Sequence, residues 1–201
     1  IYASNFGDFG MEQWHRSISE NLEFLTGRRT TQRSFDFHES GFKDKEVDFK
    51  CYSDDEPTRW VSKDTRFKGR LIGGCMDIID WFCRKDLADV AGFVERYADD
   101  GIVWYMETFA MDDPQIFEMF KRMDRKGWLE NISGFVFGRP IFYEGEDYIK
   151  SVYESAYQYD VPMVFEADVG HKAPRMTFIN GAIADFDVKD GACELSYTFK
   201  E

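Results

Sequence analysis

Apolar residues change their spacing along the chain in a way that separates strands from helices. Three short apolar runs, at residues 102–106, 134–138 and 163–165, are rich in residue types that favour strands. Between them lie two stretches with apolar residues at three- and four-residue steps, one beginning at Asp112 and one over residues 146–159. The order strand, helix, strand, helix, strand predicts a parallel βαβαβ unit with right-handed crossovers.

The end of the chain carries a different pattern. Apolar residues over 176–179 and 182–188 flank the dipeptide Asn180-Gly181, which predicts a tight hairpin. Asp190-Gly191 offers a second tight turn before residues 193–199. We therefore predict an α/β fold in which the parallel unit is joined by a second, antiparallel β layer, a swivelling β/β/α-like arrangement.

Residues 1–68 are predicted to precede the main domain as a linker helix and a lid-like excursion. Apolar residues between Met11 and Leu25 recur at helical spacing, and Gly27 fits the end of a helix. Residues 28–68 are polar and charged, with only weak alternation, as in a long surface excursion. The main domain is predicted over residues 69–201. Because Ile1 falls within a pattern already under way, we expect the chain to belong to a longer protein.

Charge and composition exclude several classes of function. The net charge of −13, without a basic stripe, makes nucleic-acid binding improbable, and no apolar run is long enough to span a membrane. The cysteines lack zinc spacing, so no metal site is expected, and they suggest reduced thiols in the cytoplasm. Nothing in the sequence indicates a cofactor. The cysteines are Cys51, Cys75, Cys83 and Cys193.

Three polar residues follow the three predicted parallel strands. Glu107 ends the first strand, Arg139 follows the second, and His171 lies just beyond the third. Because ligands bind beyond the carboxyl ends of parallel strands, we expect these side chains near one another. Two alternatives remain open at this point: Glu107 could only cap the next turn, and His171 could be an incidental loop histidine.

Four segments resemble the LD-carboxypeptidase and microcin-immunity family of serine peptidases. Residues 101–107 (G-I-V-W-Y-M-E) resemble the family's glycine, apolar strand and glutamate, and residues 161–171 resemble its strand ending in Gly-His. Residues 69–74 resemble its G-R-L-x-G-G step, and residues 134–138 its second strand. The resemblance covers roughly residues 69–199.

The resemblance implies a Ser-Glu-His triad in which His171 is the general base and Glu107 orients it. The serine and the oxyanion donors would lie in a missing N-terminal domain. The implied substrate is a small peptide with an amide beside a free carboxylate, such as an LD-tetrapeptide muropeptide, or a microcin-like peptidyl nucleotide. The full-length protein is expected to be a cytoplasmic homodimer, and this chain alone is expected to be inactive.

Two positions depart from the family pattern, and both favour the alternative that the chain is a catalytically inactive ligand-binding module. The family usually has Asn where this chain has Cys75, and often Arg where it has Glu118. Cys75 is better interpreted as a packing or substrate-wall residue than as a replacement nucleophile. Arg139 is a further candidate for substrate binding.

Trp60 is the third candidate for substrate binding. It lies in the long excursion, which is similar to a family loop whose tryptophan covers the active site and stacks on a nucleobase. We expect residues 50–66 to be displaced or mobile as a lid. The alternative is that Trp60 only pins the long loop to the body of the protein.

Overall fold

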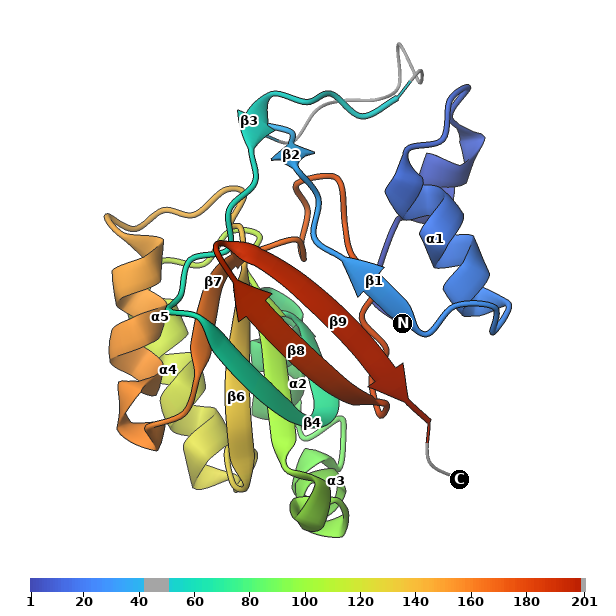
Figure 1. Ribbon diagram of the computed structural model, residues 1–201. Helices are drawn as coiled ribbons and strands as arrows, with labels where there is room; N and C mark the ends of the chain where they lie inside the picture. Colours follow the sequence, from blue (N-terminus) through green and yellow to red (C-terminus); the bar gives the residue numbers. More distant parts are fainter. Residues whose placement is uncertain (42–50, 200–201) are drawn as a thin grey trace.

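A computed structural model describes residues 1–41 and 51–199. At its centre is a mixed seven-stranded sheet with the strand order β1-β9-β8-β4-β5-β6-β7 (Figure 1). Its strands are β1 (Thr31–Arg33), β4 (Thr65–Cys75), β5 (Ile102–Glu107), β6 (Ile132–Gly138), β7 (Met163–Ala167), β8 (Ile183–Lys189) and β9 (Ala192–Thr198). A separate antiparallel pair is formed by β2 (Phe37–His38) and β3 (Glu56–Pro57).

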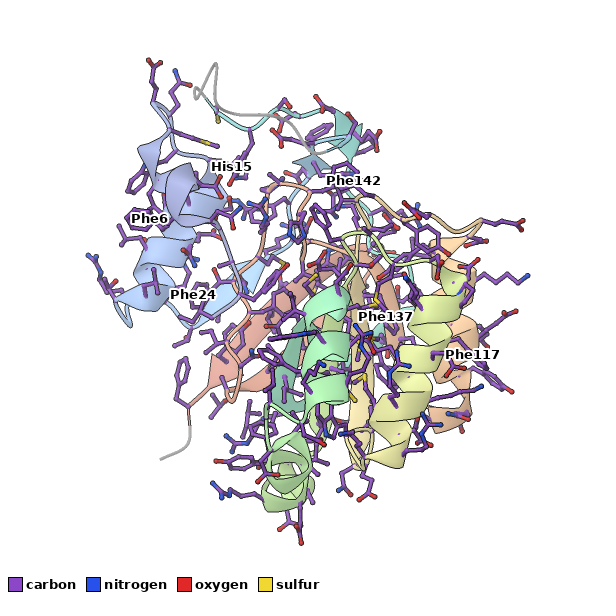
Figure 2. The ribbon with its side chains drawn as sticks, turned by 180° about the vertical axis from the view of Figure 1, so that it is seen from behind. Phe6, His15, Phe24, Phe117, Phe137 and Phe142 are labelled. Carbon is purple, nitrogen blue, oxygen red and sulfur yellow. The ribbon has the colours of Figure 1, made fainter. Side chains whose placement is uncertain are left out.

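Strands β4 to β7 are parallel, as the sequence predicts for β5, β6 and β7. Helix α4 (Asp113–Arg125) connects β5 to β6, and α5 (Tyr148–Ala156) connects β6 to β7. Helix α4 begins at a capping box in which Asp112 and Gln115 satisfy each other's backbone amides. Helices α2 (Met76–Lys85) and α3 (Val90–Arg96) lie between β4 and β5 in the sequence. Figure 2 shows α2 and α4 in front of the strands, so helices cover this face of the sheet.

The antiparallel part is joined to the parallel part through the long strand β4. Residues 65–70 of β4 pair antiparallel with β8, and residues 70–75 pair parallel with β5. The predicted α/β fold with a parallel unit and an antiparallel part is confirmed. The antiparallel part, predicted as a second layer, is continuous with the parallel strands within one hydrogen-bonded sheet.

The hairpin predicted at Asn180-Gly181 is wrong, although the chain does turn there. Both edges of β8 are already paired, one with β4 and one with β9, so residues 176–179 cannot join it. The backbone of Phe178 pairs instead with Tyr2, in an isolated antiparallel bridge. The second predicted turn, at Asp190-Gly191, does connect β8 to β9.

The N-terminal segment contains a short 3-10 helix, η1 (Phe6–Gly10), and helix α1 (Arg16–Leu25). The helix begins later than predicted because the His15 side chain accepts a hydrogen bond from the Ser17 amide and caps it. Strand β1 then pairs with β9 at the edge of the main sheet, beside α1 in Figure 1. The division of the chain at residue 68 stays a prediction.

Among the described residues, two large apolar clusters lie on opposite faces of the sheet, and a small third one forms around Met11 and Ile18. Alternate residues of β5 enter opposite clusters, with Val103 and Tyr105 in one and Trp104 and Met106 in the other. Every residue of β5 is buried, because it lies at the centre of the parallel part and is covered on both faces. The last of these buried residues is Glu107, so a buried carboxylate lies at the carboxyl edge of the sheet.

Gly73 allows β4 to approach β5 closely just before the carboxyl edge. A Cβ atom at this position would lie 1.8 Å from the carbonyl oxygen of Tyr105, and φ is +154°. We expect Gly73→Ala to lower the free energy of unfolding by about 3 kcal/mol, because backbone atoms cannot move aside without separating the strands. Urea denaturation measures this change.

The matched control is Gly7→Ala, where an added Cβ would meet no atom within 4 Å. Equal unfolding free energies for the two variants would contradict the close approach of the strands.

Candidate active site

Glu107 and His171 form a hydrogen-bonded pair at the carboxyl edge of the parallel sheet. His171 Nδ1 lies 3.0 Å from Glu107 Oε2. The glutamate side chain is fully buried, whereas 29% of the histidine side chain is exposed. The predicted proximity of these two residues is confirmed. An ionised carboxylate can only accept, so the bond assigns a proton to Nδ1, and in the neutral form of the ring Nε2 is then the acceptor.

Gly170 brings the histidine loop directly against the glutamate. Its φ is +124°, and an added Cβ would lie 3.1 Å from Glu107 side-chain atoms. Only glycine combines this backbone conformation with so close a contact. The Gly-His sequence is therefore a geometric requirement of the pair.

Arg175 holds the same loop from its other side. Its guanidinium donates to the carbonyl oxygens of Gly170 at 2.6 Å and of His171 at 2.9 Å. A third donor forms an ion pair of 3.0 Å with Asp8, and both side chains are buried. Sequence reasoning missed Arg175, because its acidic partner lies 167 residues away in the chain.

Tyr2 donates its hydroxyl to the second oxygen of Glu107, at 2.6 Å. Burial, followed by the charge of Glu107, raises the pKa of Tyr2 well above its ordinary value. The phenol therefore stays protonated and acts as a donor over the physiological pH range. Tyr2 was also missed, since an aromatic residue near the start of the chain carries no pattern of its own.

An aromatic side chain packs against the imidazole. The Phe109 ring stands edge-on to His171, with ring centroids 4.8 Å apart. The backbone of this turn is fixed by Asp77, whose carboxylate accepts from the amides of Phe109 and Ala110 at 2.9 and 3.2 Å. The start of α2 thereby sets the position of the wall beside the histidine.

His171 faces a cleft of about 640 Å³ between the N-terminal segment and the start of α2. The described part of the chain contains no group of three or more His, Cys, Asp or Glu residues that could hold a metal ion. Within residues 1–41 and 51–199 there is also no helix long and apolar enough to cross a membrane. The cleft is lined by, among others, Tyr2, Cys75, Ile78, Phe109, His171 and Arg175.

A family model described as LD-carboxypeptidase C-terminal domain matches residues 68–186, more than half of the chain. The chain belongs to this family. No curated protein matches it.

Solved structures share the fold of this chain. An MccF-like protein from Streptococcus pneumoniae in complex with AMP is 18% identical, with a TM-score of 0.67 over 95% of this chain and 60% of that one. The muramoyltetrapeptide carboxypeptidase from Oxalobacter formigenes is 17% identical, with a TM-score of 0.60 over 96% and 58%. The microcin C7 self immunity protein MccF, bound to aspartyl sulfamoyl adenosine, is 12% identical, with a TM-score of 0.68 over 100% and 61%. These identities show a shared fold, and the chain spans about 60% of the length of these structures.

Arg139 does not line the cleft of this LD-carboxypeptidase C-terminal domain, contrary to the sequence-based expectation. Only 1% of the residue is exposed, and its guanidinium pairs with Asp168 at 2.8 Å and donates to the Glu166 carbonyl oxygen at 2.9 Å. Arg139 does follow the carboxyl end of β6, as the sequence predicts. It turns inward because Asp168 is a fully buried carboxylate that requires a charged partner.

The lid predicted around Trp60 is wrong. The residue is 1% exposed, its indole donates to Asp168 Oδ2 at 3.1 Å, and its amide donates to the Gly191 carbonyl oxygen. A buried indole has no free face on which a nucleobase could stack. Trp60 instead pins the excursion to the body of the domain, the alternative considered from the sequence. Residue 50, the first residue of the predicted lid, lies outside the described residues.

The two positions that depart from the family pattern differ in their surroundings. Glu118 lies on the exposed side of α4 and pairs with Lys121 at 3.2 Å. Cys75 lines the cleft, lies opposite Glu107 in the β4–β5 register, and contacts Asp77 Oδ2 at 3.4 Å. Burial, together with the charges of these two carboxylates, raises the pKa of the Cys75 thiol to about 12. A neutral thiol fits a wall of the cleft and not a nucleophile.

This raised pKa gives a pH-dependent prediction. Because the folded protein favours the protonated thiol up to about pH 12, we expect iodoacetamide at pH 8 to modify Cys75 at least ~100-fold more slowly than the exposed Cys51. The rate at Cys75 should still be rising at pH 10. Peptide mass spectrometry over a time course measures both rates, and comparable rates at pH 8 would contradict the assignment.

Proposed function

We propose that this chain supplies the His and Glu of a Ser-Glu-His triad in a serine-type carboxypeptidase. The observation that supports this is the fully buried carboxylate of Glu107 bonded to Nδ1 of His171. That bond holds the ring in the tautomer whose Nε2 can accept a proton from a hydroxyl nucleophile. The carboxylate would then stabilise the imidazolium that forms.

The nucleophile is expected outside these residues. In the described part of the chain, no hydroxyl or thiol is hydrogen-bonded to His171, whose ring bonds to Glu107. The structural neighbours are longer chains, of which this one covers about 60%. We therefore propose that a serine and its oxyanion donors come from an N-terminal domain that meets the cleft, and that residues 1–201 alone do not hydrolyse peptides.

Two substrate classes fit the proposal. One is a peptide with an amide next to a free carboxylate, and the other is a peptidyl nucleotide with an amide bond. A muropeptide is supported by the neighbour that is a muramoyltetrapeptide carboxypeptidase. A peptidyl nucleotide is supported by the neighbours bound to AMP and to aspartyl sulfamoyl adenosine. The four free cysteines support action in the cytoplasm. A homodimer of the full-length protein remains part of the proposal.

A ligand-binding module without catalytic activity is the second candidate. It is favoured by Cys75, where the family usually has Asn, because this position lines the cleft next to the His-Glu pair. Such a module would keep the cleft and lose turnover. The two candidates differ in whether the full-length protein hydrolyses either substrate class.

We expect His171→Ala and Glu107→Gln, made in the full-length protein, each to lower kcat by about 10³-fold or more. Loss of the imidazole removes the proton acceptor, and the amide of Gln can stabilise the wrong tautomer. Substrate binding should change less than turnover. The assay measures hydrolysis of an LD-tetrapeptide and of an aminoacyl-sulfamoyl nucleotide.

The matched control is Glu95→Gln on α3, where the glutamate is exposed and the kinetics should be unchanged. If the unaltered full-length protein binds these compounds without hydrolysing them, the binding module is the correct function. If it hydrolyses them and His171→Ala is equally fast, the triad assignment is wrong.

A further inference from the structure

Glu107 is a fully buried carboxylate with one hydrogen-bond donor on each oxygen. His171 occupies Oε2 at 3.0 Å, and the Tyr2 hydroxyl occupies Oε1 at 2.6 Å. We propose that Tyr2 is a positioning residue of the His-Glu pair: it fixes the rotation of the carboxylate so that Oε2 stays on His171 Nδ1. This inference deepens the proposed function and rests on it for its catalytic consequence.

The backbone presents Tyr2 rigidly to the glutamate. The amide of Tyr2 donates to the Phe178 carbonyl oxygen and the amide of Phe178 donates to that of Tyr2, both at 2.7 Å. The Tyr2 ring also stands edge-on to Tyr105, with centroids 5.8 Å apart. Phe178 is itself fully buried against Tyr105. The hydroxyl is therefore held by a reciprocal backbone bridge and an aromatic contact, and its reach to Glu107 is set by the core.

A carboxylate at the end of a strand needs such a constraint. Its terminal torsion is broad, so a single donor leaves the group free to rotate and to exchange its oxygens. Within residues 1–41 and 51–199, the hydrogen bonds to Glu107 side-chain oxygens are those from Tyr2 and His171. Without the tyrosine hydroxyl, Oε1 would be a buried acceptor with no partner, and the single bond to His171 would no longer fix which oxygen faces the imidazole.

The contact also explains why residues 1–6 lie across the cleft. Tyr2 is 105 positions from Glu107 in the sequence, and its neighbours Ile1, Ser4 and Phe6 line the same cleft as His171. The N-terminal segment thus serves as a wall of the cleft and as the support of the glutamate. Displacing it would release the orienting group of the base.

The test compares Tyr2→Phe with the matched control Tyr105→Phe. Each change removes one hydroxyl and keeps the ring, and within the described residues no hydrogen bond joins the Tyr105 hydroxyl to Glu107. In ¹⁵N-labelled protein, NMR reports the tautomer of His171 and the exchange of its Nδ1 proton with water. We expect one Nδ1–H tautomer in the unaltered protein and in Tyr105→Phe. In Tyr2→Phe we expect a mixture of tautomers and proton exchange about 10-fold faster.

Backbone amide exchange at Tyr2 and Phe178 shows whether the segment stays in place in the variant. If these amides remain protected and the His171 signals of Tyr2→Phe match those of the unaltered protein, Tyr2 has no positioning role. If the segment detaches and His171 still keeps a single, slowly exchanging Nδ1–H tautomer, the proposal is equally overturned.

The NMR result does not depend on hydrolysis, so failure of this inference is distinguishable from failure of the proposed function. In the full-length protein we expect Tyr2→Phe to lower kcat about 10-fold with KM within about twofold, as misorientation of the base predicts. If Tyr2→Phe changes the His171 signals but neither the unaltered protein nor any variant hydrolyses the substrates, the positioning role stands and the peptidase function is rejected. Hydrolysis with an unchanged kcat in Tyr2→Phe would reject the catalytic importance of Tyr2.

Discussion

The fully buried carboxylate of Asp168 holds the domain together at its functional edge. One oxygen pairs with the Arg139 guanidinium, and the other accepts from the Trp60 indole and from the amide of Phe35. These donors come from the end of β6, from the long excursion and from the segment after β1. A buried charge is tolerated only when its hydrogen bonds are satisfied, so the three segments must converge on the residue three positions before His171. The placement of the histidine loop follows from this convergence.

A second layer of constraint acts on the histidine loop itself. Gly170 allows the loop to touch Glu107, and Arg175 binds two of its carbonyl oxygens while Asp8 neutralises the guanidinium. Backbone carbonyls held by a buried arginine cannot drift without leaving donors unsatisfied. The imidazole is therefore held in one orientation, as the proposed role of general base would require.

Family membership and catalytic competence are separate properties of this chain. The match to the LD-carboxypeptidase C-terminal domain covers residues 68–186, and the fold shared with the MccF-like protein extends over 95% of the chain. Under the proposed function, catalysis would require an acceptor at Nε2 of His171 and a hydroxyl that can reach it, beside the wall of the cleft at Cys75. The geometry provides the first of these, and the neutral thiol at Cys75 does not take the place of the second.

The sequence alone determined the parallel unit, because β5, α4, β6, α5 and β7 arise from local periodicity and short-range caps. It also brought Glu107 and His171 together, since the carboxyl ends of parallel strands share one edge. Only the tertiary structure decided that Arg139 and Trp60 turn inward to Asp168, that Phe178 pairs with Tyr2, and that Tyr2 and Arg175 support the pair. The contacts of Tyr2 and Trp60 join residues 105 or more positions apart in the sequence. Arg139 lies 29 positions from Asp168, and Arg175 holds the loop in which it lies itself. Buried polar groups choose partners by proximity in space, and no local pattern encodes that choice.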